Sequence, residues 1–113
     1  MLLYNSPAVT GVNLAPETVA ELARHPNVVG IKETGSDAAQ LAAYVDLTPL
    51  PPAFTVIAGS VPTCYASLCL GARAAILAAA CVVPELCIRL YEVDRATTRS
   101  SRTQRTCTTA TVS

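Results

Sequence analysis

Short apolar runs recur along the chain, and each is followed by a segment in which apolar residues have helical spacing. The runs lie at 1–4, 28–31, 54–58 and 74–80. They are apolar at consecutive positions, as in parallel strands covered by helices, rather than alternating as in a sheet with one wet face. The pattern predicts an α/β fold with four β-α units in series around a parallel sheet.

Helix boundaries between these runs can be read from proline and capping residues. Pro16, Pro62 and Pro84 mark three helix starts, because proline has a suitable φ and lacks an N–H that the first turn would leave unpaired. Asp37 can cap a further helix, which the prolines within 49–52 should end. The helices therefore alternate with the predicted strands.

The chain changes character near residue 93. From there on threonine, serine and arginine dominate, with almost no apolar residue to bury. Such a composition predicts a disordered Thr/Ser/Arg-rich tail over 93–113 and leaves 1–92 as the folded domain. Four arginines lie in this tail without aromatic neighbours, which favours a solvated segment over an arm that binds nucleic acid or lipid.

Charge and cysteine content narrow the function classes. Eight basic and eight acidic residues give zero net charge, so neither nucleic acid nor an anionic membrane is expected as a partner. Five cysteines without a CxxC pair, and a single histidine, indicate neither a disulfide framework nor a zinc site. No apolar run is long enough for a signal-peptide core or a membrane span. We expect a cytoplasmic protein with reduced thiols, or a mitochondrial one if an upstream targeting segment is missing.

Two residues could carry chemistry. Lys32, the only lysine, follows the run 28–31 at the carboxyl end of a predicted buried strand, where active sites of parallel α/β folds lie. A lysine in an apolar setting loses hydration, which favours the neutral amine that attacks carbonyls. Tyr4 lies 28 residues earlier, close to the length of one βαβ unit, so its phenol could relay protons beside Lys32. The alternatives are a surface lysine and a tyrosine packed at the sheet rim.

Two motifs in register give these residues a context. Segment 4–11 reads Tyr-Asn-Ser-Pro-Ala-Val-Thr-Gly, and segment 29–34 reads Val-Gly-Ile-Lys-Glu-Thr. Both resemble signatures of the dihydrodipicolinate synthase / N-acetylneuraminate lyase family of Schiff-base aldolases, at the family's spacing. Segments 54–60 and 70–76 continue the resemblance. It implies a (β/α)₈ TIM barrel, of which this chain would supply only strands five to eight.

The resemblance also implies roles for particular residues. Lys32 would form the Schiff base with a 2-keto acid such as pyruvate, and Tyr4 would relay protons. Gly59, Ser60 and Ile76 would line the pocket of the pyruvoyl group, although Gly59 and Ser60 also suit a strand-to-helix turn and Ile76 suits a core position. No metal or organic cofactor is implied. The expected function is pyruvate-releasing aldol cleavage, or the reverse condensation.

Departures from the family pattern leave alternatives open. Ala8 and Val9 stand where synthases usually carry Gly-Arg, which favours a 2-keto acid aldolase such as 4-hydroxy-2-oxoglutarate aldolase over a dihydrodipicolinate synthase proper. The four preceding barrel strands, with the segment that holds the pyruvate carboxylate, are not in this sequence. A non-catalytic truncated paralogue or an interaction fragment, with self-association, is therefore the second hypothesis. An unrelated flavodoxin-like binding domain is the third, and the lack of a glycine-rich loop after the first strand disfavours it.

Overall fold

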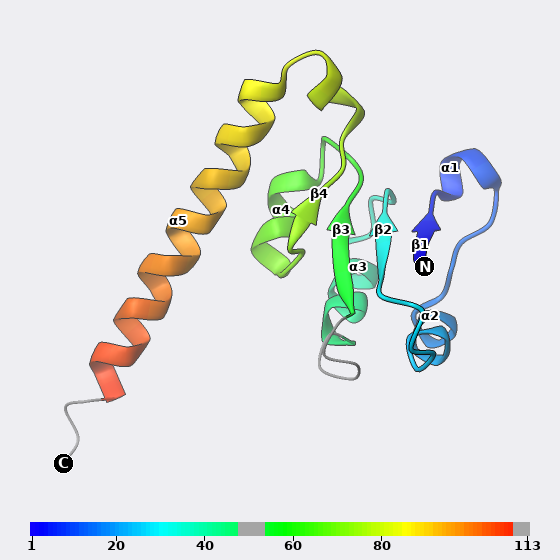
Figure 1. Cartoon of the computed structure of the whole chain (residues 1–113), viewed down its shortest axis with the longest axis horizontal. Helices are drawn as coiled ribbons and strands as arrows, with labels where there is room; N and C mark the ends of the chain where they lie inside the picture. Colours follow the sequence, from blue (N-terminus) through cyan, green and yellow to red (C-terminus); the bar gives the residue numbers. More distant parts are fainter. Residues whose placement is uncertain (48–53, 110–113) are drawn as a thin grey trace.

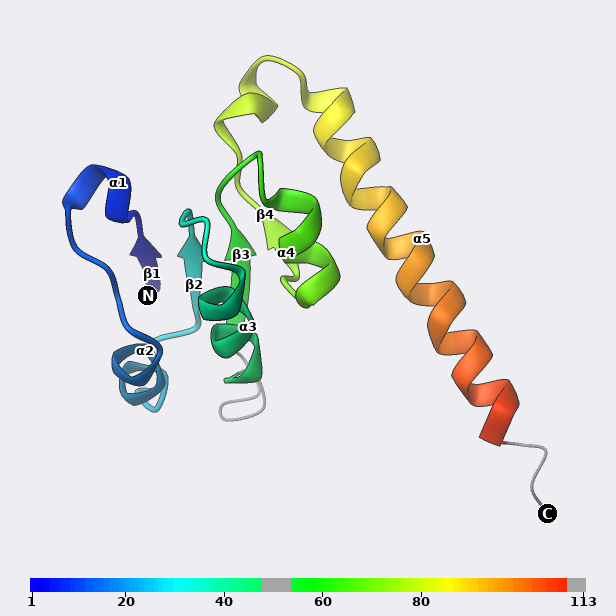
Figure 2. The same ribbon diagram turned by 180° about the vertical axis from the view of Figure 1, so that it is seen from behind.

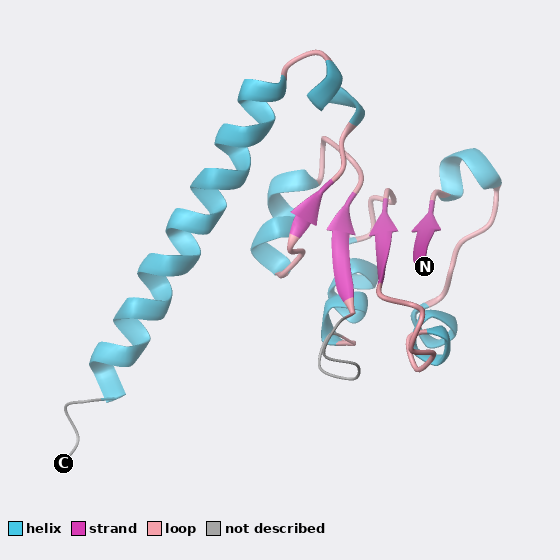
Figure 3. Ribbon diagram, in the orientation of Figure 1, coloured by secondary structure: helices cyan, strands magenta, loops and turns pink. Residues whose placement is uncertain are grey.

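The four predicted strands form one parallel sheet. The structure, a computed structural model, describes residues 1–47 and 54–109, with side chains as far as residue 98. Strands β1 (Leu2–Asn5), β2 (Gly30–Glu33), β3 (Thr55–Ala58) and β4 (Ala74–Ala75) lie side by side in chain order (Figures 1 and 3). The parallel α/β prediction is confirmed.

Three helices cover one face of this sheet. Helices α2 (Pro16–Leu22), α3 (Ala38–Asp46) and α4 (Cys64–Leu70) lie in front of the strands when the molecule is seen from behind (Figure 2). Helix α2 begins at the predicted proline. The Asp37 carboxylate caps α3 by accepting the backbone N–H groups of Ala39 and Gln40 at 2.9 and 3.1 Å. Helix α4 begins two residues later than predicted, and Gly71 caps its carboxyl end.

The remaining helical segments follow the outer strands. Helix α1 (Pro7–Thr10) comes directly after β1, and the 3₁₀ helix η1 (Ala78–Cys81) comes shortly after β4. Helix α5 (Pro84–Thr109) begins at the predicted proline, runs back beside β4 and extends beyond the sheet (Figure 1). No helix in the described part of the chain is long and apolar enough to cross a membrane.

The core lies between the sheet and the covering helices. Successive side chains of a strand point to opposite faces, and the members that face the helices are fully buried, as Ile31 and Val56 show. Val19, Leu41 and Phe54 complete the centre of this core. Each such side chain stabilises the fold by about 1.5–3 kcal/mol relative to an exposed one.

The opposite face of the sheet is open. Tyr4 on β1 is 57% exposed and Ile76, just after β4, is 49% exposed. Lys32 alternates with the buried Ile31 and Glu33, so its side chain belongs to this open face. The strands were expected to be covered on both faces, and within the described residues only the helix face is.

Two expectations differ from the structure. The run 74–80 yields only the two-residue strand β4, because the chain turns into η1 at Ala78. The segment from residue 93 was expected to be a disordered tail, yet α5 continues as far as Thr109. Neither glycine nor proline interrupts 85–109, so nothing in the local sequence stops the helix. The prolines within 49–52 and the end of the predicted tail, 110–113, lie outside the described residues.

Candidate functional site

Tyr4 and Lys32 lie beside each other at the carboxyl ends of neighbouring strands. The register of β1 and β2 pairs these two residues directly. The Lys32 ammonium nitrogen lies 4.3 Å from the centroid of the Tyr4 ring. At this distance the ring face attracts a cation. The proximity expected from the 28-residue spacing is therefore present.

Gly59 approaches Lys32 from the next strand. Its N–H donates to the Glu33 carbonyl at 2.7 Å, which continues the pairing of β3 with β2 beyond Ala58. A Cβ atom at residue 59 would lie only 2.9 Å from Cε of Lys32. The absence of a side chain at Gly59 therefore lets the lysine pass close over the end of β3.

The other two predicted pocket residues lie near the same strand ends. Ser60 directly follows Gly59 and is half-buried. The Ile76 N–H donates to the Ala58 carbonyl at 2.9 Å, and the Ile76 side chain is largely exposed. The five predicted residues thus come from four successive strand ends, while the substrate-binding roles of Gly59, Ser60 and Ile76 stay predictions.

A polar cluster lies on the helix face of the same strand ends, and sequence reasoning missed it. Asn5 and Glu33 directly follow Tyr4 and Lys32, pair with each other in register, and are only 1% and 3% exposed. The Asn5 amide donates to the Glu33 carboxylate at 2.7 Å. The signal was available, because each residue that follows a catalytic candidate along a strand must point to the opposite face.

Tyr44 of helix α3 belongs to this cluster, since its hydroxyl accepts the Asn5 amide at 3.5 Å. Its hydroxyl donates to the Leu14 carbonyl, and its ring is fully buried. Burial raises the pKa of Tyr44 above its ordinary value of 10.0, and the nearby Glu33 carboxylate adds to the rise because a second negative charge there is unfavourable. The phenol is thus held in its neutral form.

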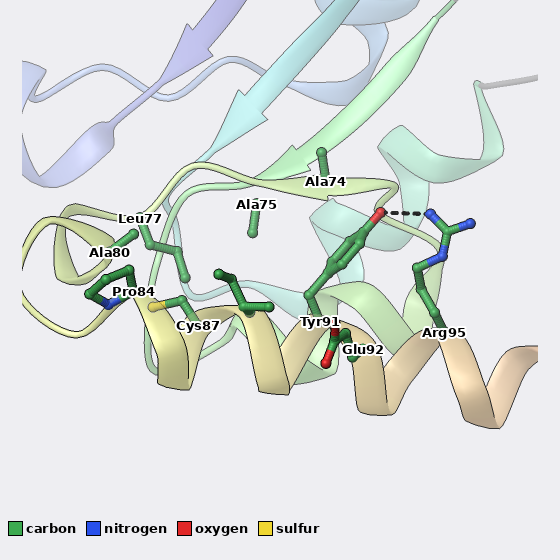
Figure 4. A pocket seen from close by; sticks show the side chains of 10 residues that line it. Ala74, Ala75, Leu77, Ala80, Pro84, Cys87, Tyr91, Glu92 and Arg95 are labelled. Carbon is green, nitrogen blue, oxygen red and sulfur yellow. Dashed lines mark hydrogen bonds between the residues drawn. The ribbon is translucent and has the colours of Figure 1, made fainter.

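A separate groove lies between helix α5 and strand β4. Its volume is about 690 Å³, and it is lined mainly by apolar side chains, including Leu77, Cys87 and Ile88 (Figure 4). Tyr91 crosses it, donating to the Arg73 carbonyl at 2.9 Å and accepting from Arg95 at 3.1 Å. None of the predicted site residues lines this groove.

Known proteins resemble this chain in sequence and in fold. A model of the dihydrodipicolinate synthetase family matches residues 1–108. The 4-hydroxy-tetrahydrodipicolinate synthase of Methanoculleus marisnigri is 43% identical over 96 residues, which are 85% of this chain and 33% of the relative. The synthase of the same name from Methanosphaerula palustris is 42% identical over 91 residues, which are 80% of this chain and 31% of that relative.

A solved structure shows what the sheet corresponds to. A prophage protein of the dihydrodipicolinic acid synthase family from E. coli K12, in complex with pyruvate, superposes with a TM-score of 0.77 at 34% identity. The match covers 85% of this chain and 33% of that protein. The four-stranded sheet is therefore part of the family's (β/α)₈ barrel, and the chain spans about a third of the length of the curated relatives named above.

These relatives also bear on the expected activity. Both curated relatives are named as synthases, so the preference for another 2-keto acid aldolase, based on Ala8 and Val9, finds no support in them. The family consists of carbon–carbon lyases, as the motifs around Tyr4 and Lys32 had implied. The match over nearly the whole chain and the shared fold show that this protein belongs to the dihydrodipicolinate synthetase family.

Proposed function

We propose that Lys32 forms an imine with a 2-keto acid, and that the protein derives from a lyase that makes or breaks a carbon–carbon bond next to that imine. The observation that carries this proposal is the position of the Lys32 nitrogen 4.3 Å from the Tyr4 ring, at the carboxyl ends of adjacent parallel strands. Such strand ends form the active face of barrel enzymes.

The chemistry uses the amine of Lys32 as a nucleophile. The neutral amine adds to the C2 carbonyl of the keto acid, and loss of water from the carbinolamine gives a cationic imine. In the cleavage direction the C4 hydroxyl gives its proton to a base, the C3–C4 bond breaks, its electron pair passes into the enamine, and an aldehyde leaves. Protonation of C3 and hydrolysis of the imine then return the keto acid and the free lysine. Condensation runs through the same steps in reverse.

Tyr4 serves two purposes in this scheme. The face of its ring attracts the positive charge of the imine as it attracts the ammonium group. Its phenol is a candidate to move protons to and from the carbinolamine and the substrate hydroxyl. Gly59 leaves room for the lysine, and Ser60 and Ile76 are proposed to line the keto-acid pocket on the open face.

Pyruvate is the keto acid that we propose. The E. coli relative is described in complex with pyruvate, and the curated relatives are synthases of 4-hydroxy-tetrahydrodipicolinate. The partner that condenses with pyruvate, or is released from the larger substrate, is aspartate semialdehyde or another aldehyde or keto acid.

We expect the 113-residue chain by itself to be a weak catalyst. Holding the reactants in place can lower the activation free energy of such reactions by about 7–11 kcal/mol. The face that carries Tyr4 and Lys32 is open within the described residues, and the chain spans about a third of its relatives' length. A non-catalytic role is the second candidate, and the openness of this face within the described residues favours it.

Borohydride trapping tests the imine directly. Incubation with pyruvate and borohydride should add one reduced pyruvate to the peptide that contains Lys32, and mass spectrometry of the digest locates the adduct. Lys32→Arg is the control that keeps the charge and lacks a reactive amine. Absence of an adduct at Lys32, or an adduct only at the chain's amino terminus, would refute the proposal.

Activity assays address the second candidate. Pyruvate release from 4-hydroxy-2-oxoglutarate and from N-acetylneuraminate, and condensation of pyruvate with aspartate semialdehyde, should be slow with this chain. Robust turnover that Lys32→Arg abolishes would show that the chain supports a complete site and would exclude the non-catalytic role.

A further inference from the structure

The Tyr4–Lys32 pair lies on a face that offers it little support. Tyr4 is more than half exposed, and among the described strands β1, from which it comes, pairs only with β2. Neither side chain is held by packing in the way that a core residue is. The relative position of the two side chains therefore depends on how the ends of β1 and β2 are held together.

Asn5 ties the end of β1 to β2. Its side-chain amide donates to Glu33 at 2.7 Å, and its side-chain oxygen accepts the N–H of Leu14 at 3.0 Å. Its backbone carbonyl accepts two further bonds from Thr34, one from the N–H at 3.1 Å and one from the hydroxyl at 2.8 Å. The side-chain amide also donates to the Asn13 side-chain oxygen at 2.9 Å and to the Tyr44 hydroxyl at 3.5 Å. Six hydrogen bonds thus hold the residue that directly follows Tyr4.

Glu33 is the acceptor at the centre of this arrangement. One carboxylate oxygen accepts the N–H of Gly35, and the other accepts the amides of Asn5 and, at 3.4 Å, Gln40. The backbone carbonyl of Glu33 also accepts the N–H of Gly59 at 2.7 Å. The residue that directly follows Lys32 is therefore bound to both neighbouring strand ends.

We propose that Glu33, acting through Asn5, is a positioning residue that holds Tyr4 over Lys32. The two pairs occupy consecutive register positions, so the Asn5–Glu33 bond on the helix face fixes the separation of the strands one residue away from the Tyr4–Lys32 contact on the open face. Charged acceptors make shorter and stronger hydrogen bonds than neutral ones. This inference rests on the proposed function for its catalytic meaning, although its geometry does not.

The single lysine makes the contact measurable without substrate. Protein labelled with ¹³C at lysine Cε gives one side-chain signal, from Lys32. The Tyr4 ring lies against this side chain and should shift the signal upfield by its ring current. Tyr4→Leu provides the reference without a ring, so the difference between the two proteins reports the contact alone.

Glu33→Gln should remove most of this Tyr4-dependent shift. A glutamine amide oxygen can satisfy Gly35 or Asn5 but not both, because its amino group would face a donor at the other position. Adding Asn5→Asp to Glu33→Gln exchanges donor and acceptor between the two side chains. The paired amides of Asn13 and Gln40 can turn over together to match the exchange, so the double variant should recover the shift. Thr34→Val, which removes only the hydroxyl bond to Asn5, should cause a partial loss and serves if Glu33→Gln does not fold.

A matched control separates positioning from general stability. Leu68→Ala in helix α4 removes a buried side chain that makes no contribution to the Asn5–Glu33 pair, so it should lower stability and keep the shift. A full shift in Glu33→Gln or in Thr34→Val, or no recovery in the double variant, would overturn the proposal. Pyruvate trapping, measured separately, reports on the imine; a normal trapping result with an unchanged shift would refute positioning alone, and failed trapping with a Glu33-dependent shift would refute the proposed function alone.

Discussion

Gly59→Ala is predicted to destabilise the fold and to displace Lys32. The added Cβ would lie 2.5 Å from the Thr34 methyl carbon and 2.9 Å from both the Glu33 carbonyl oxygen and Lys32 Cε. The lysine can move away. The other two atoms cannot move freely, because the Thr34 hydroxyl bonds to Asn5 and the Glu33 carbonyl accepts the N–H of residue 59 itself.

The magnitude follows from two opposing effects. Overpacking of this kind costs about 1–3 kcal/mol, and replacing glycine by alanine returns about 0.4–1 kcal/mol by restricting the unfolded chain. We expect the free energy of unfolding to fall by roughly 1–2 kcal/mol, which for a urea slope of about 1–3 kcal/mol per M lowers the midpoint by roughly 1 M. Circular dichroism during urea titration measures it.

Gly11→Ala is the matched control for this variant. Gly11 has a φ of +71°, and a Cβ there would meet no atom within 4 Å. Its cost of about 1–2 kcal/mol would come from the left-handed backbone alone, so stability should fall without a change at Lys32. If Gly59→Ala left both the stability and the Lys32 ¹³C signal unchanged, the close approach described for Gly59 would be wrong.

Three further predictions concern the helix face. Asp37→Ala should lower the free energy of unfolding by about 1 kcal/mol through loss of the α3 cap, as measured by urea denaturation. Asp37→Asn should keep most of the stability, because an asparagine side chain also caps helices. Because the pKa of Tyr44 is higher folded than unfolded, its stabilisation is complete below pH 10.0 and declines above it; stability curves of Tyr44→Phe should show a shallower loss in this alkaline range. Burial raises the pKa of the Cys64 thiol, so an alkylating reagent should modify the exposed Cys69 and Cys81 first and reach Cys64 only on unfolding; equal rates by peptide mapping would contradict its burial.

Much of the scaffold could be predicted because it depends on local sequence. The apolar runs gave the strand positions, and Pro16, Asp37 and Pro84 gave helix starts, since capping and proline geometry act within one turn. The proximity of Tyr4 and Lys32 followed from the length of one β-α unit combined with parallel pairing.

The sequence could place Asn5 and Glu33 on the helix face by strand alternation, but not predict their hydrogen bonds. Asn5 and Glu33 entered the sequence analysis only as members of their motifs. Those hydrogen bonds, including the one to Tyr44, depend on strand register and on how α3 packs against the sheet, which are tertiary properties. The length of α5 was missed for a different reason, because low apolar content argues against packing and says little about a continuous helix without glycine or proline.

The alternation of the two doublets, Tyr4-Asn5 and Lys32-Glu33, limits which insertions and deletions the protein can tolerate. A one-residue insertion within β2 ahead of Lys32 would turn the amine toward the helices and bring the Glu33 carboxylate to the open face. The role proposed for Lys32 and the positioning role proposed for Glu33 would then be lost in the same event. Length changes in the turn after α2 leave both doublets in phase, so natural length variation should gather there and avoid the strands.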